Sequence, residues 1–272
     1  MSRSEEIYYD TLAPEDISAE LAPLINDLGL QENCRELASQ GWTVLRDVAN
    51  DSFNERLRQI ILDVTQQRSG ANMLLTHDPI FAQTVLMPKL MALAEFSVGR
   101  GFLLSQVATS VRRRNDPPIG LHADHNWLPA PFPAHNMLMT ACWSCDGYTE
   151  AGGSTLVVPG THTLRRHPNA TEIHRLEEAV PILCEPGEVA VWDGNIWHSN
   201  YPRTLQGERV VCHLTYSRLM MRQVEDYRDH ADQLIAQYGP QMAQLLGAND
   251  MLMSSSGADY SKLRDTFNNA KR

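Results

Sequence analysis

The sequence predicts a mainly β protein with flanking helices, in which the strands form an antiparallel sandwich or barrel. Between about residues 101 and 220, short β-branched and aromatic runs alternate with glycine and proline turns. Before and after this stretch, apolar residues recur at helical intervals. The sequence shows no internal repeat and no interdomain linker. We therefore expect one domain spanning residues 1–272.

The first hundred residues form the predicted helical lead-in. Apolar residues at helical spacing predict helices over residues 14–30, 34–41, 51–67 and 87–99. The helix at 51–67 is expected to begin with Asp51 or Ser52 as its N-cap. Gly41 is expected to end the second helix, and "WTVL" after it predicts a short strand.

The β core is predicted over about residues 101–220 and a C-terminal helical extension over about 221–272. Its expected strands lie within residues 101–111, 135–145, 152–160, 179–187, 188–194 and 208–217. Each run is bounded by glycine, proline or another turn-forming residue, as is typical of an antiparallel sheet with short connections. After residue 222 the helical pattern returns and is ended by Gly239 and Pro240.

Composition limits the possible partners. The net charge is −10, which disfavours a nucleic-acid partner because such binding depends on a basic face. Arg112, Arg113 and Arg114 form a local basic run, interpreted as a solvated edge rather than a contact for an anionic substrate. No apolar run is long enough to span a membrane, and the first residues lack a secretory h-region. We expect a cytoplasmic protein with a small-molecule partner.

The five cysteines are expected to be buried core thiols. Their odd number and scattered positions do not indicate a disulfide framework. "CWSC" (142–145) lies in a predicted strand, where residues three apart point to opposite faces. No second CxxC is present to complete a zinc site.

The tripeptide "HAD" occurs at 122–124 and again at 230–232. Chance supplies about 0.6 His-x-Asp pairs in a chain of this composition, so a single match has little weight. The second copy lies in a helical pattern, where residues two apart diverge by about 200° around the axis. The first copy follows "NDPPIG", which disfavours helix, and in an extended chain residues two apart share a face. The first copy is therefore the predicted metal-binding segment.

A distant histidine completes the predicted site. His198 follows the run "GEVAVWDGNIW", and two histidines with one carboxylate leave open positions on an octahedral Fe(II) ion. Zinc accepts the same ligands, so the ligand types alone leave a hydrolase open. Arg209 begins the next predicted strand, from which its guanidinium can bind a carboxylate of a cosubstrate such as 2-oxoglutarate. His213 shares its strand parity and is a candidate for the barrel interior beside the site, but a core histidine with its own hydrogen bonds is the favoured interpretation.

These segments together resemble the phytanoyl-CoA dioxygenase family of Fe(II)/2-oxoglutarate oxygenases. The matching elements are "LHADHNW" (121–127), "GGSTLVVPGTH" (152–162), "PGEVAVWDGNIWH" (186–198) and Arg209. The resemblance covers about residues 35–220. It implies a double-stranded β-helix (a jelly-roll, cupin-like barrel) with a metal site at one open end.

The resemblance also implies residue roles. Iron would be held by His122, Asp124 and His198, and 2-oxoglutarate would be bound by Arg209, with Thr161 and Asn200 beside it. Trp127 and His125, which follow the first ligands, are expected to edge the substrate pocket. Because Asp124 is present, whereas related halogenases lack that carboxylate, hydroxylation is the expected reaction.

The leading hypothesis is a dioxygenase that hydroxylates an unactivated C–H bond of a small organic substrate. Dioxygen and 2-oxoglutarate would be consumed, and succinate and CO2 released. An acyl thioester, a polycyclic natural product and an amino-acid-like solute all remain candidate substrates. The alternatives are a non-catalytic jelly-roll binding protein and a cupin-like metal isomerase or hydrolase.

Overall fold

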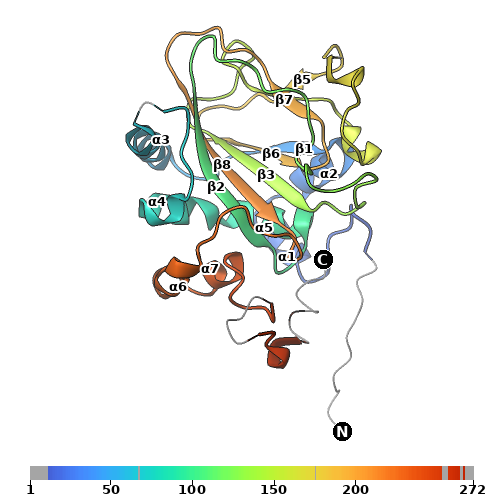
Figure 1. Ribbon diagram of the computed structural model, residues 1–272, viewed down its shortest axis with the longest axis vertical. Helices are drawn as coiled ribbons and strands as arrows, with labels where there is room; N and C mark the ends of the chain where they lie inside the picture. Colours follow the sequence, from blue (N-terminus) through green and yellow to red (C-terminus); the bar gives the residue numbers. More distant parts are fainter. Residues whose placement is uncertain (1–11, 67, 175, 253–256, 264–265, 267–272) are drawn as a thin grey trace.

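The computed structural model describes residues 12–66, 68–174, 176–252, 257–263 and 266. Two antiparallel sheets form its centre, as Figure 1 shows. The larger sheet has the strand order β1-β6-β3-β8-β2 and the smaller has the order β5-β4-β7. The strands of the larger sheet are β1 (Trp42–Leu45), β2 (Leu103–Arg112), β3 (Leu138–Ser144), β6 (Val189–Asp193) and β8 (Arg209–Ser217). Those of the smaller sheet are β4 (Thr155–Val157), β5 (Val180–Pro181) and β7 (His198–Asn200).

The two sheets pack face to face over a small apolar cluster. Val44, Cys142, Trp192 and Val211 from the larger sheet meet Val157 of β4 there. This two-sheet arrangement with helices around it is the predicted mainly β, jelly-roll fold, and that prediction is confirmed.

The longest strand pair, β2 with β8, positions several side chains of the cavity described below. The pair runs from Arg112 opposite Arg209 to Leu103 opposite Ser217. Its register shifts between Leu104 and Gln106, as expected for a β-bulge, a feature that is frequent beside active sites. Along β2, alternate residues from 107 to 111 are buried under the helices, and those between them are partly exposed toward the smaller sheet.

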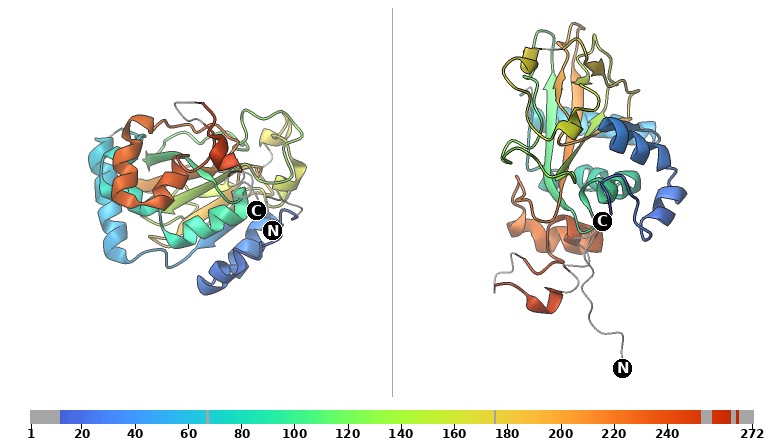
Figure 2. Two further views of the ribbon diagram at one scale, coloured as in Figure 1. Left: turned by 90° about the horizontal axis from the view of Figure 1, so that it is seen from below. Right: turned by 90° about the vertical axis from the view of Figure 1, so that its right-hand side faces the viewer.

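Helices cover the outer face of the larger sheet, as Figures 1 and 2 show. They are α1 (Ala22–Asp27), α2 (Gln31–Gln40), α3 (Asp51–Thr65), α4 (Pro79–Val85) and α5 (Pro88–Val98). Their apolar faces join the outward side chains of the sheet in the main hydrophobic core. After β8 the chain forms α6 (Ala231–Tyr238) and α7 (Pro240–Leu245), which lie at the bottom of Figure 1. Short 3-10 helices are η1 (Leu74–Thr76), η2 (Thr161–Leu164), η3 (Glu172–His174), η4 (Arg228–His230) and η5 (Tyr260–Lys262).

Two local predictions in the lead-in are wrong. The helix expected over 14–30 is confined to α1, because Pro23 lies in its first turn and a proline ring would clash with the preceding turn of a longer helix. The N-cap of α3 is Asn50, whose side chain accepts a hydrogen bond from the Phe53 amide, rather than Asp51 or Ser52. Gly41 does end α2, with a left-handed φ of 87°.

None of the helices in the described ranges combines the length and apolarity needed to cross a bilayer. The five cysteines are all buried thiols, as predicted.

Candidate metal centre

The first "HAD" segment is extended and lies beside β7. His122 and His198 exchange backbone hydrogen bonds of 3.0 and 2.8 Å, and the amide of Asp124 donates to the Gly194 carbonyl at 2.8 Å. Leu121 and Ala123 pack into an apolar cluster on one side, so the alternating residues His122 and Asp124 face the other side. The two-residue repeat of an extended chain therefore directs both polar side chains toward His198.

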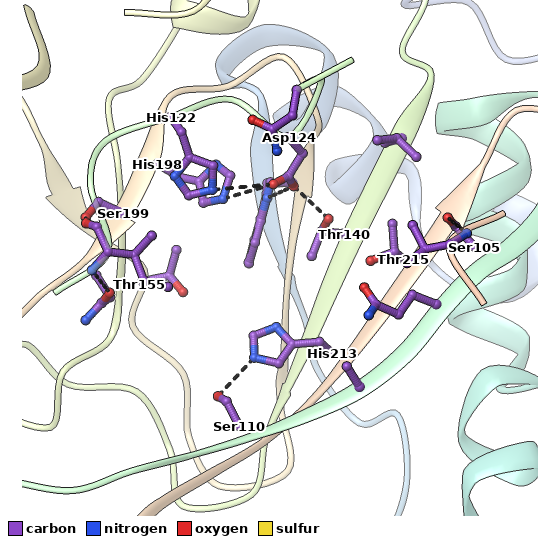
Figure 3. Close-up of a pocket in the computed structure, with 18 of the residues that line it drawn as sticks. Ser105, Ser110, His122, Asp124, Thr140, Thr155, His198, Ser199, His213 and Thr215 are labelled. Atoms are coloured by element: carbon purple, nitrogen blue, oxygen red, sulfur yellow. Dashed lines mark hydrogen bonds and ion pairs between the residues drawn. The ribbon is translucent and has the colours of Figure 1, made fainter. Parts of the chain in front are cut away.

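Three donor atoms from these side chains converge at one point. The Nε2 atoms of His122 and His198 lie 3.7 and 3.4 Å from Oδ1 of Asp124, and all three donors lie within 4.8 Å of one another. Figure 3 shows the two imidazoles beside the carboxylate at the wall of a cavity; their ring centres are 4.3 Å apart and the rings are tilted by 48°. This spacing fits a single ion coordinated by all three groups.

The remaining polar atoms of these side chains are occupied by protein hydrogen bonds. His122 Nδ1 bonds to the Gly120 carbonyl at 2.8 Å and His198 Nδ1 to the Ile196 carbonyl at 3.2 Å. Because a carbonyl only accepts, each Nδ1 carries the proton and each Nε2 keeps a lone pair for a metal.

The carboxylate of Asp124 is oriented in the same way. Its Oδ2 accepts hydrogen bonds from the Thr140 hydroxyl at 2.8 Å and the Trp192 indole at 3.1 Å, which leaves Oδ1 for the ion. Burial alone would raise the pKa of Asp124, but the nearby histidines and these hydrogen bonds outweigh it and lower the pKa. Burial lowers the pKa of His198 against the opposing effect of Asp124. Both shifts favour the protonation states that bind metal.

Arg209 lies in the same cavity. It begins β8, is only 4% exposed, and holds its guanidinium 5.0 Å from the ring centre of Tyr148. Its Nη1 donates to the Gly153 carbonyl, and its buried Nε has no hydrogen-bond partner within the described ranges. An unpartnered buried N–H is costly, so this guanidinium is suited to an anionic ligand.

The cavity between the sheets has a volume of about 340 Å³, which is within the range of small-molecule sites. Its lining forms a ladder along β2 and β8. Arg112 opposite Arg209 forms one end, His213 opposite Ala108 lies further along, and Gln106 opposite Thr215 lies toward the other end. The cavity is completed by the three donor residues and by Ser105, Ser110, Ile119, Asn126, Trp127, Leu138, Thr140, Tyr148, Thr155, Trp192, Ser199, Asn200 and Val224.

The other predicted site residues divide into two groups. Asn200 and Trp127 line the cavity; Trp127 is 71% exposed at its rim. His213 also faces inward, where its Nε2 bonds to Ser110 Oγ at 3.0 Å and its Nδ1 lies 2.9 Å from Cys142 Sγ. Thr161 and His125 are not among the lining residues.

Both of these exceptions have a local cause. His125 is one residue beyond Asp124, so its side chain points away from the cavity and is buried against Phe132 and Asn195. It was expected at the edge of the substrate pocket, and the structure places it in the core instead. Thr161 closes the turn before η2: its hydroxyl donates to the Val158 carbonyl and accepts from the Trp197 amide. Its position supports the strand that carries His198 and lies away from the cavity.

Sequence reasoning missed several residues of the cavity, among them Arg112 and the two groups that orient Asp124, Thr140 and Trp192. Arg112 was interpreted as part of a solvated edge, yet it lines the cavity beside Arg209. Its neighbours behave differently: Arg113 forms an ion pair with Glu208 at 2.6 Å, and Arg114 is exposed. The signal was available in strand parity, because Arg112 shares the alternation of Gln106 and Ser110.

The fold and this site together define a jelly-roll protein with a two-histidine, one-carboxylate centre and an arginine in the same cavity. Residues 29–210 match the family model described as phytanoyl-CoA dioxygenase. The chain belongs to this family, and it is accordingly an Fe(II)- and 2-oxoglutarate-dependent oxygenase, as the resemblance implied.

Several known proteins are similar to this chain. An uncharacterized protein of Mycobacterium tuberculosis is 23% identical over 82% of this chain and 88% of its own length. Dioxygenase af480 of Aspergillus fumigatus is 23% identical over 73% of this chain and 64% of its own. Among solved structures, EctD from S. alaskensis with 2-oxoglutarate and 5-hydroxyectoine has a TM-score of 0.58 at 17% identity, covering 77% of this chain and 78% of EctD. HygX from Streptomyces hygroscopicus with nickel and 2-oxoglutarate has a TM-score of 0.57 at 14% identity, covering 76% and 89%.

Proposed function

We propose that this protein hydroxylates an unactivated C–H bond of a small organic substrate and converts 2-oxoglutarate to succinate and CO2. In this proposal His122, Asp124 and His198 hold Fe(II). The supporting observation is the convergence of three donor atoms, Nε2 of each histidine and Oδ1 of the aspartate. The second polar atom of each of these side chains already forms a hydrogen bond within the protein. Hydroxylation is supported by the retained Asp124 and by the fold shared with EctD, which was solved with a hydroxylated compound.

The proposed division of labour follows from the ligand set. Bound Fe(II) would supply the activation of dioxygen that is coupled to oxidation of the cosubstrate. Two histidines and one carboxylate leave three positions open, enough for a bidentate 2-oxo acid and dioxygen. The protein's own contribution is orientation: Gly120 and Ile196 carbonyls hold the imidazoles, and Thr140 and Trp192 hold the carboxylate.

Arg209 is proposed to bind the distal carboxylate of 2-oxoglutarate. It lies within the cavity, its Nε has no partner among the described residues, and Tyr148 excludes water from one face of the guanidinium. Asn200, two residues beyond His198, is proposed to border the same ligand. HygX and EctD were both solved with 2-oxoglutarate, which supports the cosubstrate though not the individual contacts.

The substrate is proposed to occupy the end of the cavity farthest from Arg209 along β8. The side chains that line this end are neutral: Ser105, Gln106, Leu138, Thr215 and Val224. Trp127 is an exposed, apolar lining residue that can contact an apolar body at the rim. This lining favours an uncharged molecule with hydrogen-bonding groups over an amino-acid-like zwitterion. A cytoplasmic location and a single domain over 1–272 remain parts of the proposal.

A turnover assay tests this function. Purified protein with Fe(II) and ascorbate is expected to convert 2-oxoglutarate to succinate, and Arg209→Ala should reduce the rate by at least about tenfold. Arg114→Ala, which alters an exposed arginine, should leave the rate unchanged. Absence of 2-oxoglutarate binding to the metal-loaded protein would overturn the proposal. It would favour a binding protein or a metal isomerase or hydrolase.

A further inference from the structure

The cavity contains two arginines that face each other across paired strands. Arg112 ends β2, Arg209 begins β8, and the two are directly opposite in the antiparallel register. Both line the cavity. Cβ atoms at such positions are about 5 Å apart, and like charges placed there repel each other.

No carboxylate in the described part of the chain forms an ion pair with either guanidinium. The charge of Asp116 acts to raise the pKa of Arg112, and its carboxylate accepts a hydrogen bond from the Arg113 amide. Burial and the charge of Arg209 lower the pKa of Arg112. The cavity therefore holds two positive charges that its own side chains do not neutralise, and an anionic ligand would compensate them.

Neutral groups hold Arg112 in this position. Its Nη1 donates to the Pro117 carbonyl at 2.8 Å and its Nη2 to Oδ1 of Asn200 at 3.3 Å. The same Asn200 oxygen accepts the Ile119 amide at 2.9 Å. Since Asn200 lies in β7 two residues after His198, this contact links Arg112 to the strand that carries a metal-site histidine.

We propose that Arg112 and Arg209 jointly bind the distal carboxylate of 2-oxoglutarate, with one guanidinium contributed by each strand. This inference rests on the proposed function. A carboxylate has two oxygens and can accept hydrogen bonds from two guanidiniums. One anion then relieves the repulsion between the arginines and satisfies the unpartnered Nε of Arg209. Arg112 thereby makes the site selective for 2-oxo diacids over 2-oxo monoacids.

Calorimetry on protein loaded with Mn(II) under anaerobic conditions tests the inference. Arg112→Gln should weaken 2-oxoglutarate binding by about tenfold or more, because a charge-assisted hydrogen bond is lost. Arg209→Gln should weaken it further. Arg114→Gln is the matched control from the same basic run, and its Kd should stay within about twofold of the wild-type value.

A second ligand separates direct contact from a structural role. In 2-oxopentanoate a methyl group replaces the distal carboxylate. Arg112→Gln should leave its affinity unchanged if Arg112 contacts that carboxylate, whereas a distorted cavity would weaken both ligands equally. The melting temperature without ligand should stay close to the wild-type value in Arg112→Gln, because the removed like-charge repulsion offsets the lost hydrogen bonds to Pro117 and Asn200.

The outcomes are distinct. If the wild type binds 2-oxoglutarate and Arg112→Gln binds it within about twofold as well, the inference is overturned and the proposed function stands. Equal weakening of both ligands also overturns it. If the wild type binds no 2-oxoglutarate at all, the proposed function fails together with the inference.

Discussion

The two "HAD" segments have identical sequences and different surroundings. At 122–124 the chain is extended and pairs with β7, so His122 and Asp124 face one cavity. At 230–232 the segment passes from η4 into the first turn of α6, and both His230 and Asp232 are exposed. The comparison teaches that the backbone decides whether an i, i+2 pair can share an ion.

The third donor reinforces this difference. His198 reaches the first segment through paired backbone hydrogen bonds, so the same strand contact that fixes the chain also brings the third ligand. Asp232 instead lies at the N-terminal turn of a helix, where a carboxylate interacts favourably with the helix dipole. One copy fits a metal centre and the other fits a helix terminus.

Removing each aspartate in turn gives the largest expected contrast. Asp124→Ala should weaken Fe(II) or Mn(II) binding by at least about a hundredfold and abolish 2-oxoglutarate turnover, because an anionic ligand is lost. Asp232→Ala should leave both unchanged. Anaerobic metal titration measures the affinities, and equal affinities in the two variants would remove the distinction between the copies.

Disturbing only the orientation of Asp124 should have a smaller effect. Thr140→Val deletes one hydrogen bond to its Oδ2 at nearly constant side-chain size, and Trp192→Phe deletes the other while keeping an aromatic ring. Groups that orient a metal ligand typically contribute about 10–100-fold in metal affinity or activity, so a loss in that range is expected from the double variant. A double variant with wild-type metal affinity would show that these bonds do not orient the ligand.

Acid should destabilise the protein through His213, another cavity histidine. Burial lowers the pKa of His213 from 6.5 to about 4, with the charge of Arg209 acting in the same direction. The unfolded chain takes up a proton near the ordinary pKa while the folded protein does not. The contribution of neutral His213 to stability is therefore complete above pH 6.5 and is lost as pH falls from 6.5 toward about 4.

The pH dependence of the melting temperature checks this. Between about pH 7 and pH 5, the melting temperature of His213→Gln should fall less than that of the wild type. The variant lacks the imidazole that takes up a proton in this range only when the chain unfolds. His230→Gln, from the exposed copy, should follow the wild-type profile. A wild-type profile in His213→Gln would mean that His213 is not held neutral.

The smallest effect is expected from the helical copy itself. Asp232→Ala removes a carboxylate from the first turn of α6 and should lower the melting temperature by about 1–2 °C. Asn substitution at the same position, which also removes the charge, is the matched variant. A loss of metal binding in either variant would contradict the assignment of this copy to a helix terminus.

The choice of His198 as the third ligand depends on the number of donors that a metal needs and on the family resemblance. Local pattern predicted the fold class, the termination of α2 at Gly41 and the shared face of His122 and Asp124. These features depend on alternation and turn residues that are readable along the chain. Strand parity along β2 indicates the inward direction of Arg112, but its pairing with Arg209, 97 positions away, depends on the β2–β8 register and is not readable from local pattern. The family resemblance placed His125 and Thr161 at the cavity, where they do not lie. His125 follows Asp124 by one residue in an extended segment and therefore points to the opposite side, toward Asn195. The hydroxyl of Thr161 is held by the Val158 carbonyl in a turn.

Anomalous diffraction from crystals grown anaerobically with Mn(II) would test the metal centre most directly. One peak is expected at about 2.0–2.3 Å from Nε2 of His122, Oδ1 of Asp124 and Nε2 of His198. No peak is expected beside His230 and Asp232. A peak elsewhere, or one that contacts only two of the three donors, would contradict the claim that these side chains bind a single ion.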